Sequence, residues 1–454
     1  MTVQTVQTVQ TGLTKELARN IINTTYDDIP QNVREHGIRS MYNWLGVAIG
    51  ASNHESVDMA LSVASAVESA GQVQILGRNE RADLLHATFI NGMSSHIFDF
   101  DDTHLDTIHH PSGPVAPVVF ALGEVNGYNE KDMIRAFVLG VETELRIANA
   151  VCPSHYDLGW HITSSAGVFG SAVAAGILLD LDEEQMVYAL GIAGTQAFGL
   201  REMFGTMTKP FHPGKAAQNG LFAAMLAKRG FTSSVQVLEA KRGFAAVTAP
   251  EYNLDEVNIN WGENWETLKN AFKPYACGIV LHPAIDACIE LRQYAKPEEV
   301  EAIQITVNPY VAELTSKPSP ATGLEGKFSI FHTCSAAFID GDAGETQYSD
   351  DRVNSEDLLS FRPKIKTIVD ENMSEEKAYA VLYTNDGRQF DVKIDHATGS
   401  LENPMTDEAL KKKFMNLVTP VLGEDKTQML TENFYRFSEV SFKDEILPYC
   451  VGNK

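Results

Sequence analysis

The densest set of ionisable side chains in the sequence lies directly after an apolar, helix-like stretch. Four carboxylates and three imidazoles fall within twelve residues: Asp99, Asp101, Asp102, His104, Asp106, His109 and His110. Imidazole titrates near neutral pH and neighbouring carboxylates can orient it, so this composition suits general acid–base catalysis. Two alternatives stay open: a solvated loop in an acidic protein, and a divalent-metal site, although the spacing matches no fixed metal motif.

A second candidate segment begins at His161, which precedes Thr163, Ser164 and Ser165. Hydroxyl side chains are favoured at helix N-caps. They would place His161 near the positive end of a helix dipole, where an anion can be held. A capped helix beside a core histidine is the alternative interpretation.

A third candidate segment, 208–215, contains Lys209, His212 and Lys215 among Pro and Gly residues. We expect a loop here that leads into a helix. Its cations could bind a carboxylate, and a loop with solvated charges is the alternative.

The net charge and the absent motifs exclude several classes of function. The chain has 36 basic and 60 acidic residues, a net charge of −24, which repels nucleic acids and anionic membranes. It lacks a Gly-x-Gly-x-x-Gly fingerprint after a strand, a Walker loop, a His-Glu-x-x-His pair and a Gly-x-Ser-x-Gly elbow. A small anionic substrate remains compatible with a local cluster of Lys and His.

The elements that must position these residues are mostly helices in the first ~250 residues, where apolar positions recur every three or four residues. Helical patterns cover 38–49, 82–90, 133–148 and 216–228, and 166–179 is apolar nearly all round, as in a buried helix. Strand patterns begin after about residue 273, at 303–307 and in a hairpin over 380–394 with a turn at Asn385-Asp386-Gly387. A helical pattern returns from Thr406.

This order of elements predicts a mainly α fold, a helical bundle interrupted by an α+β segment. At 454 residues the chain exceeds the size at which one hydrophobic core stops growing, so we expect two domains. The predicted boundaries are 1–272 for the helical domain, 273–400 for the α+β domain, and 401–454 for C-terminal helices that return to the bundle.

The beginning of the chain and its cysteines predict a cytoplasmic protein. Residues 1–11 lack the features of a secretory signal and are expected to form a frayed tail, and no run of about 18 apolar residues occurs. The five cysteines are odd in number and have no Cys-x-x-Cys spacing, so we expect reduced thiols and neither a disulfide nor a zinc site.

Several blocks of the sequence resemble the MmgE/PrpD family, whose members include 2-methylcitrate dehydratase, cis-aconitate decarboxylase and iminodisuccinate epimerase. They are Asp99-Phe100-Asp101-Asp102-Thr103, His110-Pro111-Ser112-Gly113, Gly159-Trp160-His161, Thr208-Lys209-Pro210 with His212, Lys273-Pro274-Tyr275-Ala276-Cys277 with His282, Gly326-Lys327-Phe328-Ser329 and Glu402-Asn403-Pro404-Met405. The resemblance implies a helical domain with an inserted α+β lid, an active site between the two, a homodimer, and no cofactor or metal.

The resemblance also implies roles for individual residues. His110 would donate or accept the proton, Lys209 and His161 would bind and polarise a substrate carboxylate, and Asp99 and Thr103 would orient this set. The residues expected to contact the substrate further out are Lys273, His282, His332 and His212. His332 stands where decarboxylase members have a tyrosine.

Three functions follow as alternatives. The first is a lyase that decarboxylates or dehydrates a small di- or tricarboxylic acid by proton transfer next to a carboxylate. The second is an epimerase, favoured if His110 and Lys209 approach the substrate from opposite faces. The third is a non-catalytic carboxylate-binding protein, which the intact set of candidate residues disfavours.

Overall fold

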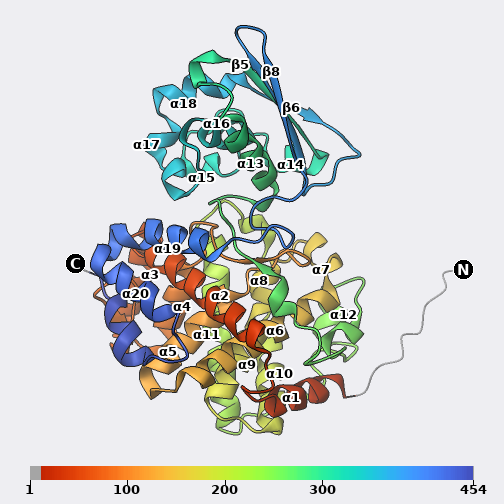
Figure 1. Ribbon diagram of the computed structural model, residues 1–454. Helices are drawn as coiled ribbons and strands as arrows, with labels where there is room; N and C mark the ends of the chain where they lie inside the picture. Colours follow the sequence, from red (N-terminus) through yellow and green to blue (C-terminus); the bar gives the residue numbers. More distant parts are fainter. Residues whose placement is uncertain (1–11, 453–454) are drawn as a thin grey trace, which may run out of the picture. The chain divides into compact units, whose positions relative to one another are not determined.

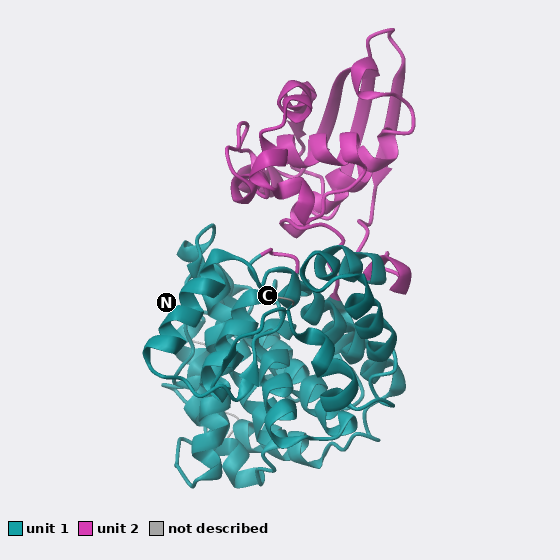
Figure 2. Cartoon of the chain, turned by 90° about the vertical axis from the view of Figure 1, so that its left-hand side faces the viewer, with its two compact units in different colours: residues 1–97, 101–270, 411–454 teal, residues 98–100, 271–410 magenta. Residues whose placement is uncertain are grey.

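The computed structural model describes residues 12–452, which form two compact units (Figures 1 and 2). The tail predicted over 1–11 lies outside these residues. Unit 1 holds the described residues up to Ile97, Asp101–Asn270 and the chain from Lys411, whereas unit 2 holds Phe98–Phe100 and Ala271–Leu410. Residues 98–100, inside the Asp-rich segment, therefore belong to unit 2. The fold is mainly α with a separate α+β part, as the order of sequence patterns predicted.

Unit 1 is built from helices. Its helices of eight or more residues are α1 (Leu13–Asn23), α2 (Gln31–Gly50), α3 (Glu55–Ala66), α4 (Leu84–Ser94), α5 (Ser112–Asn126), α6 (Glu130–Val151), α9 (Gly167–Leu178), α10 (Glu183–Gly194), α11 (Thr208–Lys228), α19 (Asp407–Leu422), which enters unit 1 at Lys411, and α20 (Glu424–Phe434). Shorter helices are α7 (Ser154–Asp157), α8 (Ile162–Ser165) and α12 (Phe244–Thr248). Side chains mark several of the starts: Asp83 accepts from the first turn of α4, and Asp182 and Gln185 form a capping box on α10.

The core of unit 1 surrounds α9, the helix predicted to be buried, whose residues are all buried. Helices α5, α6, α10 and α11 pack around it. The approach of α11 is close at Gly220, where a Cβ would lie 2.6 Å from the Ala172 nitrogen and 2.7 Å from the Val168 oxygen. Small residues on α9 and α11 thus allow the backbones to approach to a distance that larger side chains would prevent.

The chain from Lys411 onward belongs to unit 1. Phe414 of α19 stacks on Tyr42 of α2 with ring centroids 4.1 Å apart. A Cβ at Gly46 would lie 2.7 Å from the Phe414 ring, so this glycine makes the stacking possible. Among the described residues, no helix combines the length and apolar character needed to cross a membrane.

Unit 2 contains a four-stranded sheet in the order β6-β5-β7-β8: β5 (Val300–Val307), β6 (Ile365–Val369), β7 (Ala378–Thr384) and β8 (Gln389–Ile394). Strand β5 pairs in parallel with β6 (Ile303 opposite Ile365) and antiparallel with β7, and the predicted hairpin is β7–β8. Helix α13 (His282–Leu291) packs on β7 and β8, and α16 (Ile330–Asp340) packs on α13. The shorter helices are α14 (Pro309–Thr315), α15 (Gly323–Gly326), α17 (Asp350–Val353) and α18 (Glu356–Phe361).

Candidate active site

Hydrogen bonds fix the imidazole of His110, which lies directly before α5. Its Nδ1 is 2.8 Å from the carbonyl oxygen of Asp102. A carbonyl only accepts hydrogen bonds, so Nδ1 carries the proton, and Nε2 is the basic nitrogen of the neutral ring. The Thr103 hydroxyl lies 3.1 Å from the same Nδ1, and the His110 backbone N–H donates to the Thr163 hydroxyl at 3.3 Å. These three contacts fix the orientation of the ring and leave Nε2 as the nitrogen that can accept a proton.

Asp102 binds the Asp-rich segment to the start of α5. Its Oδ1 accepts from the Ser112 backbone at 3.3 Å, and its Oδ2 accepts from the Ser112 hydroxyl and from the Asn270 amide, the latter at 2.6 Å. Complete burial raises the pKa of Asp102 to about 6, against the effect of these donors. This carboxylate holds the loop whose carbonyl orients His110.

His161 and His212 form a hydrogen-bonded pair. Their Nδ1 atoms are 2.8 Å apart, and both rings are buried. Burial lowers the pKa of His212 to about 4 and that of His161 well below its ordinary value, and the neighbouring His96 and Lys209 add to both shifts. Both rings are therefore neutral at pH 7 and share one proton between the two Nδ1 atoms.

The hydroxyl groups after His161 do not cap a helix, contrary to our prediction. His161 itself is the N-cap of α8, and the Ser164 hydroxyl donates instead to the Phe198 carbonyl at 2.7 Å. The His161 backbone N–H donates to the Gly199 carbonyl at 3.0 Å. Gly199 has φ of +104°, and a Cβ there would collide with the Ser164 hydroxyl, so only glycine fits this contact.

Lys209 lies in the first turn of a helix, and the prediction of a loop over 208–215 is wrong. Helix α11 begins at Thr208 and continues through Pro213. Pro210 is tolerated because first-turn N–H groups have no partner within the helix, and packing against α4 and α9 compensates for the bond lost at Pro213. The Lys209 ammonium lies 5.3 Å from the Phe204 ring, which in turn contacts the His161 ring edge-on.

Asp99 and Lys273 bind each other within unit 2. The Lys273 ammonium donates to the Asp99 carbonyl and to its Oδ1, both at 3.0 Å, and Asp99 has φ of +53°. A second buried ammonium, that of Lys327, donates to the Phe98 carbonyl and to Glu345, both at 2.6 Å. Two lysines thus bind the segment in which Asp99 has a backbone conformation that L-residues rarely adopt.

The remaining two predicted contact residues are buried in unit 2. His332 has a protein partner at each ring nitrogen: Nε2 donates to the Gln347 carbonyl at 2.9 Å, and Nδ1 accepts from Arg362 at 3.2 Å. His282 begins α13, and its ring lies edge-on to Tyr275 with centroids 5.3 Å apart. The contacts with Gln347 and Arg362 fix the orientation of the His332 ring in unit 2.

Two family models match the chain in succession. The MmgE/PrpD N-terminal domain matches residues 15–256, and the MmgE/PrpD C-terminal domain matches residues 275–434. The chain belongs to the MmgE/PrpD family. Similar proteins include cis-aconitate decarboxylase from Aspergillus terreus, 26% identical over 93% of this chain and 92% of that one, and cis-aconitate decarboxylase from Homo sapiens, 26% identical over 92% and 90%.

Two groups of side chains in this MmgE/PrpD protein have the spacing of cation ligands. Atoms of His96, Asp101 and His110 lie within 4.8 Å of one another, as do atoms of His104, Asp106 and Glu266. In the first group the Nδ1 atoms of both histidines are hydrogen-bond donors. In the second, the Lys269 ammonium bonds to Asp106 at 3.2 Å and to Glu266 at 3.0 Å, so a side-chain cation already neutralises these carboxylates. Both are hydrogen-bonded networks.

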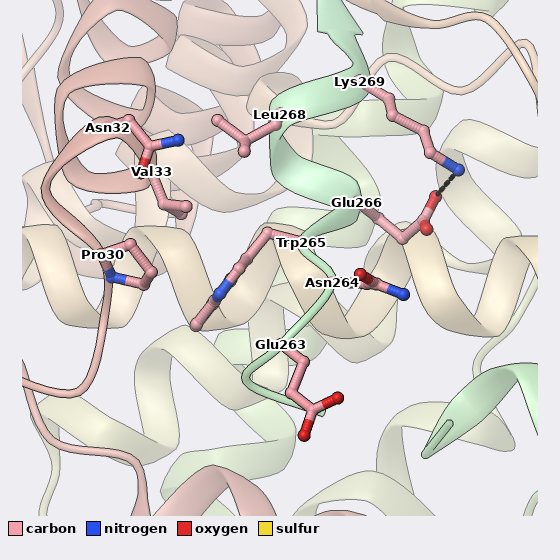
Figure 3. A pocket seen from close by; sticks show the side chains of 9 residues that line it. All are labelled: Pro30, Asn32, Val33, Glu263, Asn264, Trp265, Glu266, Leu268 and Lys269. Carbon is pink, nitrogen blue, oxygen red and sulfur yellow. Dashed lines mark ion pairs between the residues drawn. The ribbon is translucent and has the colours of Figure 1, made fainter. Parts of the chain in front are cut away.

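A cavity of about 460 Å³ in unit 1 contains none of the predicted site residues (Figure 3). Its lining comes from segments 30–33 and 263–269, and its lysine, Lys269, is paired with Glu266. Hydrogen bonds from His104 and Asn149 and the charge of Lys269 lower the pKa of Glu266 to about 2, although burial opposes them. The resulting anionic lining does not suit a carboxylate substrate.

The sequence analysis missed two buried groups of this region. His96 donates from Nδ1 to Asp101 at 2.6 Å, and Glu144 lies 3.2 Å from His109, with all four side chains fully buried. Glu144 was detectable, because it occupies the apolar face of the helix predicted over 133–148. His96 lies two residues after the end of α4. In the sequence it is only a polar residue within a stretch that the structure buries, and no pattern around it indicates a function.

Proposed function

We propose that this protein is a lyase that needs no cofactor and acts by proton transfer next to a carboxylate in a small di- or tricarboxylic acid. The observation that carries the proposal is the hydrogen bond from His110 Nδ1 to the Asp102 carbonyl, which leaves Nε2 as the basic nitrogen. Relatives across nearly the whole chain are named cis-aconitate decarboxylase, and this supports decarboxylation as the reaction.

The surrounding groups suit the charge that such a reaction develops. Removing a proton or CO₂ beside a carboxylate leaves an electron pair that the carboxylate or an adjacent double bond must take up. After loss of CO₂ the product carbon must also gain a proton, which His110 can deliver from Nε2 once that nitrogen has taken one up from solvent. Lys209 supplies a cation near this position, and His161 and His212 are neutral imidazoles that can accept protons when an anion enters. Lys209, His161 and His212 would therefore stabilise an intermediate with several negative charges more than a neutral one.

One experiment separates the possible reactions. The purified chain is incubated in D₂O with citrate, 2-methylcitrate, cis-aconitate or iminodisuccinate and followed by NMR. Release of CO₂ supports the decarboxylase, loss of water supports the dehydratase, and deuterium exchange with inversion at one carbon identifies an epimerase. Binding without any of these changes would contradict the proposal in favour of a carboxylate-binding protein.

We also propose a homodimer, as the resemblance to the family implied. Sedimentation equilibrium of the purified full chain measures the mass of the assembly directly. A single species with the mass of one chain at micromolar concentration would contradict this part of the proposal.

A further inference from the structure

His96 is a buried imidazole next to the two histidines of the proposed site. Its ring centroid is 4.8 Å from that of His110, at 61°, and 5.7 Å from that of His161, at 29°. Its Nδ1 lies 2.6 Å from Asp101 Oδ2, and neither side chain is exposed. Among the described residues, no hydrogen-bond partner reaches its Nε2. A buried, half-satisfied imidazole costs stability, which is a reason to look for a function.

The carboxylate that holds His96 also faces His110. Asp101 Oδ1 is 3.6 Å from His110 Nδ1, whereas Oδ2 is bonded to His96. The two oxygens share the single negative charge of the Asp101 carboxylate, so the two imidazoles compete for that charge. Because the contact with His96 is shorter, the negative charge of Asp101 interacts more strongly with His96 than with His110. Asp101 therefore stabilises a protonated His110 less than it would if His96 were absent.

We propose that His96 is a positioning residue that sets the proton affinity of His110 by binding Asp101, the carboxylate that the two histidines share. The catalytic meaning of this inference rests on the proposed function, because it concerns the base of that reaction. His96 changes the basicity of His110 in the same direction whether the His96 ring is neutral or cationic. A cationic His96 repels a proton on His110 directly, and a neutral one draws Asp101 away by hydrogen bonding, so either form keeps His110 less basic.

Other titratable groups surround this pair, and their side chains are present in every variant of the test. They are Asp102, His109, His161, Lys209 and His212. Burial and these neighbours keep His109 and His161 neutral near pH 7 because their pKa values lie well below the ordinary value.

Two variants separate hydrogen bonding from filling of space. His96→Phe keeps a ring of similar size but removes the donor to Asp101, whereas His96→Asn places an amide donor near the position of Nδ1. We expect His96→Phe to raise the pKa of His110 by about 0.5 units or more, because the released carboxylate stabilises the imidazolium. We expect His96→Asn to raise it by less than His96→Phe does, because the amide donor keeps part of the Asp101 charge away from His110.

The pKa of His110 is measured on the full chain by NMR with ¹³C-labelled histidine, the signal being assigned by its loss in His110→Asn. A pKa that does not move in His96→Phe, or moves equally in both variants, would overturn the inference. Asp101→Asn provides the second test: removal of the shared charge is expected to lower the pKa of His110, and an unchanged value would also overturn it.

Kinetics then connect the measurement to the reaction. The acidic limb of the pH dependence of kcat/KM is expected to move upward in His96→Phe by the same amount as the NMR pKa. A limb that stays in place while the NMR pKa moves would overturn the part of the inference that gives His96 a role in catalysis. Since the NMR titration needs no substrate, failure of the proposed function leaves the test of the His96–His110 link intact.

Discussion

The Nδ1 atoms of His161 and His212 lie 2.8 Å apart and are 51 residues apart in sequence. One of the two must donate and the other accept, so the protonation of His212 decides which nitrogen of His161 carries its proton. With the proton on His161 Nδ1, its Nε2 can accept a proton. With the proton on His212 Nδ1, the Nε2 of His161 is a donor.

This relationship predicts a difference between two substitutions at His212. His212→Leu removes the partner and leaves a buried His161 Nδ1 unsatisfied, which is expected to reduce turnover at least about 10-fold. His212→Asn offers an amide near the same position and is expected to stay within about 3-fold. Steady-state kinetics on the substrate identified by NMR measure both values. Equal losses would show that His212 acts through its ring rather than through this bond.

Replacing His110 tests the general base. His110→Asn retains a donor that can reach the Asp102 carbonyl but has no basic nitrogen, and turnover is expected to fall at least about 100-fold. His110→Ala is expected to lose as much. Urea unfolding of both variants monitors the fold, and the Asn variant should match the unaltered protein. Near-normal turnover in either variant would exclude His110 as the base.

Two lysines of α11 form a matched pair for testing the cation. Lys209→Met removes the ammonium beside Phe204 and His161 and is expected to cost roughly 2–4 kcal/mol of transition-state stabilisation. Lys215 lies six residues further along the same helix and donates to Gln218 at 2.5 Å, and Lys215→Met should cost under about 1 kcal/mol. The ratio of kcat/KM values gives both numbers. A larger effect at Lys215 would mean that the wrong lysine has been assigned.

Metal chelators are expected to leave activity unchanged. The carboxylates and imidazoles that are close enough to hold a cation are bound to one another or to Lys269 in this structure. Assays with and without EDTA, after dialysis, test this directly. Loss of activity that one particular divalent ion restores would assign the Asp–His segment to metal binding instead.

Stability is expected to fall with pH below neutrality. Burial is the first cause that lowers the pKa of His36, His155, His212 and His332 to about 4, from an ordinary value near 6.5. Between pH 6.5 and 4 the unfolded chain therefore binds more protons than the folded chain, and the free energy of unfolding decreases as pH decreases. Asp102, Glu144, Asp286 and Glu345 have raised pKa values and oppose this trend, whereas the lowered pKa values of His109 and His161 add to it.

Urea denaturation between pH 7 and 4.5, followed by circular dichroism, measures the slope. His332→Gln retains a side chain that can hydrogen-bond, but it does not titrate and should flatten the curve. A free energy of unfolding that rises as pH is lowered across this window would contradict the assignment of these histidines as buried and neutral.

Much of the fold could be predicted from the sequence because periodicity is local. The helix patterns over 38–49 and 133–148 lie inside α2 and α6, and the alternation at 303–307 and the turn at Asn385-Asp386-Gly387 became β5 and the β7–β8 hairpin. Segment 208–215 was missed because Pro and Gly weigh against a helix locally, whereas packing against α4 and α9 decides its state.

By itself, the sequence determined most of the elements and which ionisable residues are available, since both depend largely on residue type and on spacing along the chain. Only the tertiary structure decided which of those residues are partners. Lys273 bonds to Asp99 across 174 positions, His161 bonds to His212, and His332 is held by Arg362. Such pairings depend on how distant segments pack and on which charges lose contact with water, and neither property is carried by a short stretch of sequence.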